Sequence, residues 1–173
     1  MARPSTRVCG LFGTVAMIAA GTAAIAHPTA HPTAQAMPAA SSELAFVPAA
    51  AKVVDAFHAA LDRGDTIAAA GFLFDALVVF EGGEAERSKA EYAGHHLAAD
   101  AVFAQAVGSQ MTRRSGGASG DLAWVASEGR SLGRYKDREV DRITTETMVL
   151  RRVSGTWRIV HVHWSSRAGA AKP

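Results

Sequence analysis

Hydrophobic positions in the first half of the chain recur at helical spacing. Between 48 and 63 they form a stripe suited to burial, made of Val53, Val54, Phe57, Ala60 and Leu61. Pro48 suits a first helical turn, and Gly64 suits a helix end. We therefore predict a helix over 48–63, with His58 beside the stripe as a surface residue.

Two further helices are predicted before residue 107. Asp65 can cap a short helix over 66–74, and Ser88 can cap a longer one over 88–106. Between them, the run 76–80 is typical of a short strand that ends at a Gly-Gly turn. The predicted inward stripe of the longer helix contains Tyr92, His95, His96, Ala99, Val102 and Phe103.

From residue 107 onward the hydrophobic pattern alternates with a period of two, which is typical of strands. Turn signals at 115–120, 136–139 and 154–155 separate four predicted strands, over 107–114, 121–134, 140–153 and 156–167. Helices first and strands last predict an α+β domain, in which the three helices pack on one face of a curved antiparallel sheet.

The last predicted strand carries two histidines, His161 and His163. Because side chains alternate along a strand, both project from one face, roughly 7 Å apart. A two-residue turn at 154–155 would place Met148 opposite His161 and Glu146 opposite His163. The pattern therefore predicts that Glu146, His161 and His163 share one face.

The opposite face of this predicted hairpin is also apolar. It would carry Val149, Val160, Thr147, Val162, Thr145 and Trp164. A sheet that is apolar on both sides needs something to cover each side. We expect one face to receive the helices and the outer face to meet a second copy of the chain, which predicts a homodimer.

The N-terminal segment has the pattern of a secretory signal peptide. Arg3 and Arg7 precede an uncharged run over 11–25, and small-residue cleavage patterns end at 26 and at 36. The run is shorter than the roughly 20 residues that span a bilayer, so no membrane span is expected after cleavage. We predict a periplasmic or secreted protein with a signal peptide and the start of a tether over 1–36, a linker over 37–46, a domain over 47–167 and a disordered tail over 168–173.

Removal of the predicted signal peptide changes the charge of the chain. The full sequence has 18 Lys and Arg against 16 Asp and Glu, and residues 1–36 contain two of the basic residues and none of the acidic ones. The remaining 16 against 16 balance, which argues against a nucleic-acid partner. Cys9, the only cysteine, leaves as well, so no disulfide is predicted. We expect Arg113 and Arg114 to be solvated strand-edge charges.

The order of predicted elements and the closing run 155–165, Gly-Thr-Trp-Arg-Ile-Val-His-Val-His-Trp-Ser, resemble the nuclear transport factor 2-like (NTF2-like) superfamily. Within it, the chain is most similar to the SnoaL-like proteins and to the family of unknown function called DUF4440. The resemblance covers about 47–167 and implies a cone-shaped α+β half-barrel around a pocket, commonly dimeric through the outer sheet face. The superfamily includes isomerases, cyclases, dehydratases and epoxide hydrolases as well as binding domains, so the fold alone does not choose an activity.

The sequence supports a pocket that binds a small, mostly apolar organic molecule. We expect its polar end to be oriented by His161, His163 and Glu146, and the lining to include Tyr92, His95, Met148 and Trp157. The alternative is an enzyme of the cyclase, isomerase or hydrolase type, with His161, His163 or His95 as general acid or base and Glu146 or Glu128 as its partner. The aspartate base that the resemblance implies for isomerases has no matching motif, although Asp75 and Asp100 are available.

A third interpretation is a metal site. Imidazoles with a carboxylate suit zinc, copper or non-haem iron, and His161, His163, His95 or His96, and Glu146 could supply them. No other cofactor is predicted. The histidine pair can also be purely structural, satisfied by Glu146, a backbone group or water.

Overall fold

Helices come first along the chain and strands last, as the periodicity predicts. The computed structural model describes residues 46–169. The predicted signal peptide, nearly all of the predicted linker, and residues 170–173 of the predicted tail lie outside the described residues. Within the described part, no helix is both long and apolar enough to cross a membrane.

The helices begin where the capping residues predict. Helix α1 covers Pro48–Asp62 and α2 covers Thr66–Phe72. The Asp65 carboxylate accepts a hydrogen bond from the Ala68 N–H at 2.9 Å, and the Ser88 hydroxyl accepts one from the Glu91 N–H at 3.0 Å. Both are standard N-caps that satisfy backbone donors of the first turn. The two predicted caps are therefore confirmed.

The predicted helix over 88–106 is two helices, α3 (Lys89–His95) and α4 (Leu97–Ala106). The break falls at His96, which ends one helix and begins the other with φ −108°. Gly94 weakens the helix just before this point, and the His96 ring bonds to Glu86 on a neighbouring strand. The prediction of one continuous helix was wrong because this contact is not visible in helical periodicity.

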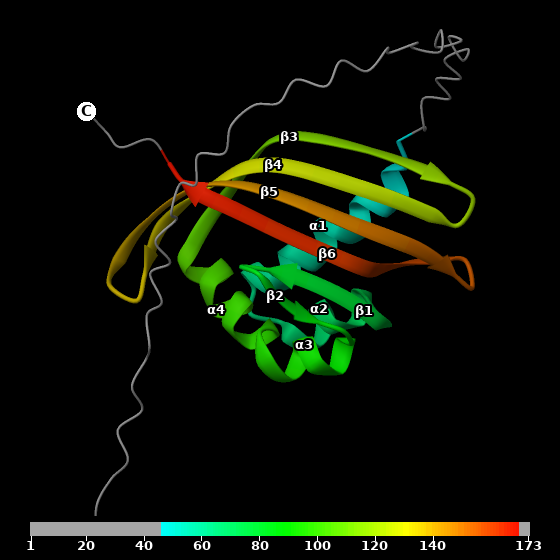
Figure 1. Ribbon diagram of the computed structural model, residues 1–173, viewed down its shortest axis with the longest axis horizontal. Helices are drawn as coiled ribbons and strands as arrows, with labels where there is room; N and C mark the ends of the chain where they lie inside the picture. The colour runs from blue at the N-terminus through cyan, green and yellow to red at the C-terminus, as the bar shows by residue number, and fades with distance from the viewer. Residues whose placement is uncertain (1–45, 170–173) are drawn as a thin grey trace, which may run out of the picture. The chain divides into compact units, whose positions relative to one another are not determined.

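Six strands form one curved sheet with the order β2-β1-β6-β5-β4-β3. Their bounds are β1 Leu73–Glu81, β2 Glu84–Glu86, β3 Val107–Ser119, β4 Leu122–Tyr135, β5 Arg138–Val153 and β6 Thr156–Ala168. Figure 1 shows the long strands β3 to β6 curving beside α1, with β1 and β2 continuing the sheet next to β6. The prediction of a wholly antiparallel sheet was wrong, because β1 pairs with β6 in parallel, and this pairing joins strands far apart in the sequence.

Two local predictions about strands need correction. The short β2 was not predicted, since three residues of sequence Glu-Ala-Glu carry no hydrophobic alternation. The turn predicted over 115–120 is a continuation of β3, which reaches Ser119 before the chain turns at Gly120. Gly116 belongs in the strand because a Cβ there would lie 2.7 Å from the Trp124 carbonyl oxygen. Glycine at this position allows close strand approach rather than a turn.

The hydrophobic core lies between the helices and the inner face of the sheet. From α1, Val54 and Phe57 are fully buried, and the sheet contributes Met148, Leu150 and Ile159, each with no exposed surface. Full burial of each such side chain stabilises the fold by about 1.5–3 kcal/mol. The core therefore holds α1 in a fixed position over β5 and β6, which positions the polar groups described below.

The register of the last hairpin is decided by a β-bulge. Near the turn, Val153 pairs with Thr156 and Leu150 pairs with Ile159, as predicted. Beyond that point the register shifts by one residue, so that Val160 is left without a partner. The observed pairs are Val149 with His161, Met148 with Val162, Thr147 with His163, and Glu146 with Trp164.

This shift overturns the predicted faces of β6. A one-residue shift moves every following side chain to the other side of the sheet. Glu146 and Trp164 therefore lie on the inner face, towards the helices, while His161 and His163 lie on the outer face. The prediction that Glu146, His161 and His163 share one face was wrong, because sequence counting assumes an unbroken ladder.

Candidate functional site

The Glu146 carboxylate is the buried polar centre of the inner face. Its side chain is 10% exposed. Oε2 accepts two hydrogen bonds, from His58 Nε2 on α1 at 2.7 Å and from the Trp164 indole N–H on β6 at 2.7 Å. The other oxygen, Oε1, is buried and has no hydrogen-bond donor among the described residues. Within residues 46–169, Glu146 thus has one oxygen that accepts two hydrogen bonds and one that accepts none.

His58 and Glu146 shift each other's pKa. Burial opposes the charged form of His58, but the hydrogen bond and the charge of Glu146 outweigh it and raise the pKa of His58. Burial alone would raise the pKa of Glu146, but His58, the Trp164 indole and Arg114 together lower it. Both pKa shifts, together with the 2.7 Å contact, favour an ion pair of a protonated imidazole and an ionised carboxylate.

Arg114 supplies the second positive charge near Glu146. It was predicted to be a solvated strand-edge residue, yet its side chain is only 15% exposed. Its Nη1 donates to Asp55 Oδ1 at 2.6 Å, and its Nε donates to Ser127 Oγ at 3.2 Å. We call Asp55, His58, Arg114 and Glu146 the Glu146 cluster; it contains two cations and two anions.

Aromatic side chains surround the Trp164 indole. Its ring stacks on Phe57, with centroids 6.4 Å apart and planes at 17°, and it also contacts Tyr92 at 6.4 Å. Phe57 in turn meets the His58 ring edge to face at 5.6 Å. These contacts hold the indole N–H in the direction of Glu146.

A second carboxyl group, Asp100 on α4, lies beyond Tyr92. The Tyr92 hydroxyl, which is buried, donates a hydrogen bond of 2.6 Å to Asp100 Oδ2. Burial raises the pKa of Asp100 above its ordinary value, although the Tyr92 hydrogen bond and the charge of His96 oppose this. Asp100 and Glu146 therefore have pKa values displaced in opposite directions, an arrangement that acid–base enzymes use.

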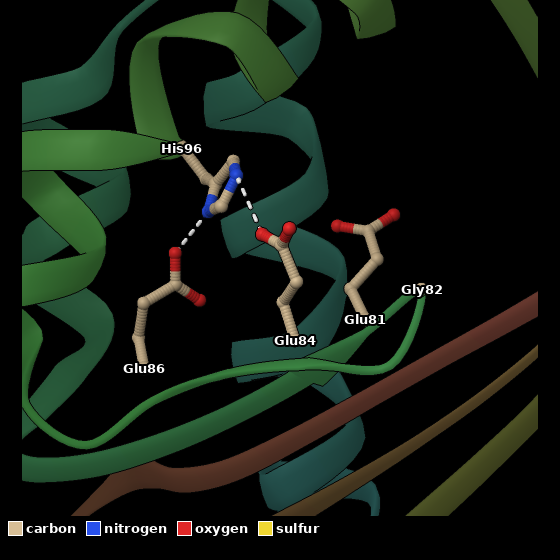
Figure 2. A pocket seen from close by; sticks show the side chains of 5 residues that line it. All are labelled: Glu81, Gly82, Glu84, Glu86 and His96. Atoms are coloured by element: carbon tan, nitrogen blue, oxygen red, sulfur yellow. Dashed lines mark hydrogen bonds and ion pairs between the residues drawn. The ribbon is translucent and has the colours of Figure 1, made fainter. Parts of the chain in front are cut away.

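A cavity of about 290 Å³ opens next to these groups, and Glu81, Gly82, Glu84, Glu86 and His96 line it. In Figure 2 the His96 ring points to Glu86 and Glu84, and Glu81 lies beside them. His96 Nδ1 bonds the largely buried Glu86, and Nε2 lies 3.8 Å from Glu84 Oε2. The hydrogen bond with Glu86 is the main cause of a raised pKa at His96.

Glu81 connects this cavity to the inner face. It pairs with Trp164 across the β1–β6 ladder, and burial followed by the negative charge of Asp100 raises its pKa. The inner face therefore carries a continuous series of polar groups, from the Glu146 cluster past Trp164 and Tyr92 to Asp100 and Glu81.

Comparison with known proteins decides the family. The family model of the SnoaL-like domain matches residues 50–169. The chain belongs to the SnoaL-like domain family. Among solved structures, it is similar to a putative ketosteroid isomerase from Shewanella frigidimarina NCIMB 400, with 38% identity over 68% of this chain and 94% of the other, and a TM-score of 0.66.

Two further structures support the fold of this SnoaL-like domain. A putative dehydratase from the NTF2-like family of Streptomyces avermitilis is 20% identical over 71% of this chain and 96% of its own, with a TM-score of 0.59. An NTF2-like protein of unknown function from Pseudomonas putida KT2440 is 21% identical over 66% of this chain and 82% of its own, with a TM-score of 0.57. The comparison with curated proteins finds no match. The NTF2-like α+β fold inferred from the sequence is thus confirmed.

The SnoaL-like fold brings some of the predicted site residues together. Glu146, Tyr92 and Met148 lie on the inner side of the sheet, and Trp157 packs on the core at the far end of β6, under the Arg152 guanidinium at 5.5 Å. His95 is exposed on α3. It makes no contact with the Glu146 cluster that would support the predicted role.

His161 and His163 lie on the outer face of the SnoaL-like domain. His161 Nδ1 donates to the Val78 carbonyl at 3.0 Å, and the Phe80 ring meets the His161 and His163 rings at 5.2 and 6.3 Å. The predicted metal set of His161, His163, His95 and Glu146 is therefore divided between the two sheet faces and α3. Within residues 46–169, no group of three or more His, Cys, Asp or Glu side chains is placed to hold a metal ion.

His58 was predicted to be a surface residue, and its contact with Glu146 was not predicted. A signal was present: His58 lies four residues after Val54 and three before Leu61, which is the spacing of the buried stripe itself. A histidine at such a position must find a polar partner inside the fold. Glu146 is that partner, 88 residues away in the sequence.

Proposed function

We propose that this SnoaL-like domain binds a small, mostly apolar organic molecule at the inner face of its sheet, with the polar end of the molecule against Glu146. The observation that carries the proposal is the buried Oε1 of Glu146, which lacks a donor among residues 46–169. A buried acceptor without a partner costs about 1–3 kcal/mol, so a ligand that donates to it recovers this energy.

The neighbourhood of Glu146 suits such a ligand. Phe57, Tyr92 and Met148 are fully or almost fully buried apolar or aromatic side chains on the same side of the sheet. Binding sites for small organic molecules combine mainly apolar walls with a few fixed polar groups. In this proposal His58 and Trp164 orient Glu146, and Glu146 alone keeps the ligand-orienting role that was predicted for it together with His161 and His163.

The test is a thermal-shift screen of small organic compounds against purified protein. Compounds that raise the melting temperature of the wild type should lose their effect in Glu146→Gln. They should keep it in His163→Ala, a matched control on the outer face. A shift that survives Glu146→Gln and disappears in His163→Ala would contradict the proposal.

A proton-transfer enzyme is the second candidate. It is favoured by the opposite pKa displacements of Asp100 and Glu146, and by the 38% identity to a structure described as a putative ketosteroid isomerase. In this candidate, Asp100 exchanges a proton with the substrate while Glu146 holds its polar end. Isomerisation of a ketosteroid is the first assay; Asp100→Asn should abolish any turnover, and His163→Ala should preserve it.

We also propose that two copies associate through the outer face of the sheet. Several large apolar side chains are exposed there, namely Phe80, Leu122, Trp124 and Leu132. Exposed apolar patches of this kind mark association surfaces. Light scattering on purified protein should give twice the mass of one chain.

Export is the remaining proposal, supported by the Arg3, Arg7 and apolar pattern of the N-terminal segment. N-terminal sequencing of the protein recovered from the periplasm or medium should begin at residue 27 or 37. A chain recovered from the cytoplasm with Met1 intact would contradict it.

A further inference from the structure

We propose that the Glu146 cluster selects ligands whose polar end is a neutral hydrogen-bond donor, such as an alcohol or enol hydroxyl, over ligands that are charged or that only accept hydrogen bonds. This inference rests on the proposed function and specifies its ligand class. It follows from three features of the cluster: its free acceptor, its balanced charge and its fixed orientation.

The free acceptor is Glu146 Oε1. Both protein donors, His58 Nε2 and the Trp164 indole N–H, go to Oε2 at 2.7 Å. An ionised carboxylate has no hydrogen to donate, so Oε1 can only accept. A ketone, ether or ester oxygen placed there could form no hydrogen bond, because it and Oε1 are both acceptors. A hydroxyl group would donate a charge-assisted hydrogen bond to Oε1.

The charge balance disfavours ionic ligands. Glu146 is paired with protonated His58, and Arg114 is paired with Asp55. Asp62 also acts on His58, but it is exposed and screened by solvent. Since both positive groups, the half-buried His58 and the largely buried Arg114, already have partners, a ligand carboxylate would add an unpaired negative charge beside Glu146. An ammonium would give up its hydration to compete with His58 for a carboxylate that is already neutralised.

The orientation of Glu146 is fixed by packed side chains. Trp164 is held by stacking on Phe57 and by contact with Tyr92. His58 is held by the Phe57 ring and by its position on α1. Turning the carboxylate away from this direction would break both hydrogen bonds, so one oxygen, Oε1, stays fixed in the position where it can meet a ligand.

Four probes of similar size test the inference: benzyl alcohol, acetophenone, phenylacetate and benzylamine. They carry a neutral donor, a neutral acceptor, an anion and a cation. Binding is measured by titration calorimetry at pH 6, where the raised pKa keeps His58 protonated. We expect benzyl alcohol to bind on the order of tenfold more tightly than each of the others.

Two variants assign the binding to the cluster. Glu146→Gln should weaken benzyl alcohol binding on the order of tenfold, and His163→Ala should leave it unchanged. Preference for acetophenone, phenylacetate or benzylamine, lost in Glu146→Gln, would overturn the inference and leave the proposed function standing. Binding of benzyl alcohol that Glu146→Gln does not weaken would also overturn the inference. Failure of all four probes to bind the wild type would overturn both.

Discussion

At the scale of single residues, the inner face is organised by a charge that packing has buried. Glu146 lies inside the fold because His58, Trp164 and Arg114 compensate the cost of removing it from water. Each of these partners comes from a different element, α1, β6 and β3. Replacement of any one of these partners should therefore raise the pKa of Glu146.

The first prediction concerns His58. His58→Ala leaves Glu146 Oε2 with one donor instead of two, so the free energy of unfolding should fall by about 1–3 kcal/mol and the pKa of Glu146 should rise. Urea denaturation and a carboxyl NMR titration measure the two effects. His95→Ala, on the exposed side of α3, is the control and should change neither quantity. An unchanged carboxyl titration in His58→Ala would contradict the ion pair.

The second prediction separates the hydrogen bond of Trp164 from its packing. Trp164→Phe keeps a ring against Phe57 and Tyr92 but removes the indole N–H. The pKa of Glu146 should rise because one of the interactions that lower it is lost. Trp157→Phe serves as the matched control, because this second β6 tryptophan packs under the Arg152 guanidinium at the other end of the strand. Equal titration of Glu146 in wild type and Trp164→Phe would rule out the positioning role.

At the scale of elements, two local irregularities determine what the site contains. The bulge at Val160 turns Trp164 inward and His163 outward. The break at His96 separates α3 from α4 and allows the imidazole to reach Glu86 on β2. Both irregularities are short, and both change which side chains meet across the fold.

The third prediction follows from the His96 break. The pKa of His96 is raised in the folded protein, so its interaction with Glu86 stabilises fully below the unfolded pKa of about 6.5 and is lost as pH rises through the higher folded value. Glu84 and Asp100 add to the same effect. The stability difference between wild type and His96→Gln should therefore shrink from pH 5 to pH 9.

Denaturant unfolding at several pH values measures this difference. The comparison with His96→Gln removes the contribution of His58, which titrates in both proteins and is not among the groups that interact with His96. His95→Gln is the control and should leave the pH dependence of the wild type intact. A difference that grows with pH would mean that the contact with Glu86 does not favour protonated His96.

At the scale of the whole molecule, the sheet has an inner face covered by helices and an outer face that no helix within residues 46–169 covers. Trp124 and Leu132 project from β4 on the outer face, where they are 37% and 47% exposed. The fourth prediction is that Trp124→Asp converts the proposed dimer to a monomer with little change in the unfolding of the single chain. Ile67→Asp, at a residue that is 88% exposed on α2, should leave the dimer intact.

Light scattering and analytical ultracentrifugation distinguish the two variants. A wild type that is monomeric at micromolar concentration would contradict the proposed dimer. Dissociation by Ile67→Asp in place of Trp124→Asp would move the interface to the helical side.

Local sequence determined the elements of this protein. Periodicity and capping rules predicted the caps at Asp65 and Ser88, the helix α1 and the existence of the four long strands, because these depend on residues close together in the chain; they missed the end of β3. The closing run of β6 resembled the NTF2-like superfamily, and the SnoaL-like match over 50–169 confirms that resemblance. Glu146, Tyr92 and Met148 lie on the inner side of the sheet, in regular parts of their elements, and their predicted contact with a ligand stays a prediction.

Only the tertiary structure decided which side chains meet. Periodicity assumes a regular ladder, and one unpaired residue at Val160 was enough to exchange the faces of His161 and Trp164. The parallel pairing of β1 with β6 and the contact of His58 with Glu146 join residues that are far apart in the sequence. Such contacts form because burial leaves a charged group without water, and the nearest donors in space, rather than in sequence, must replace it.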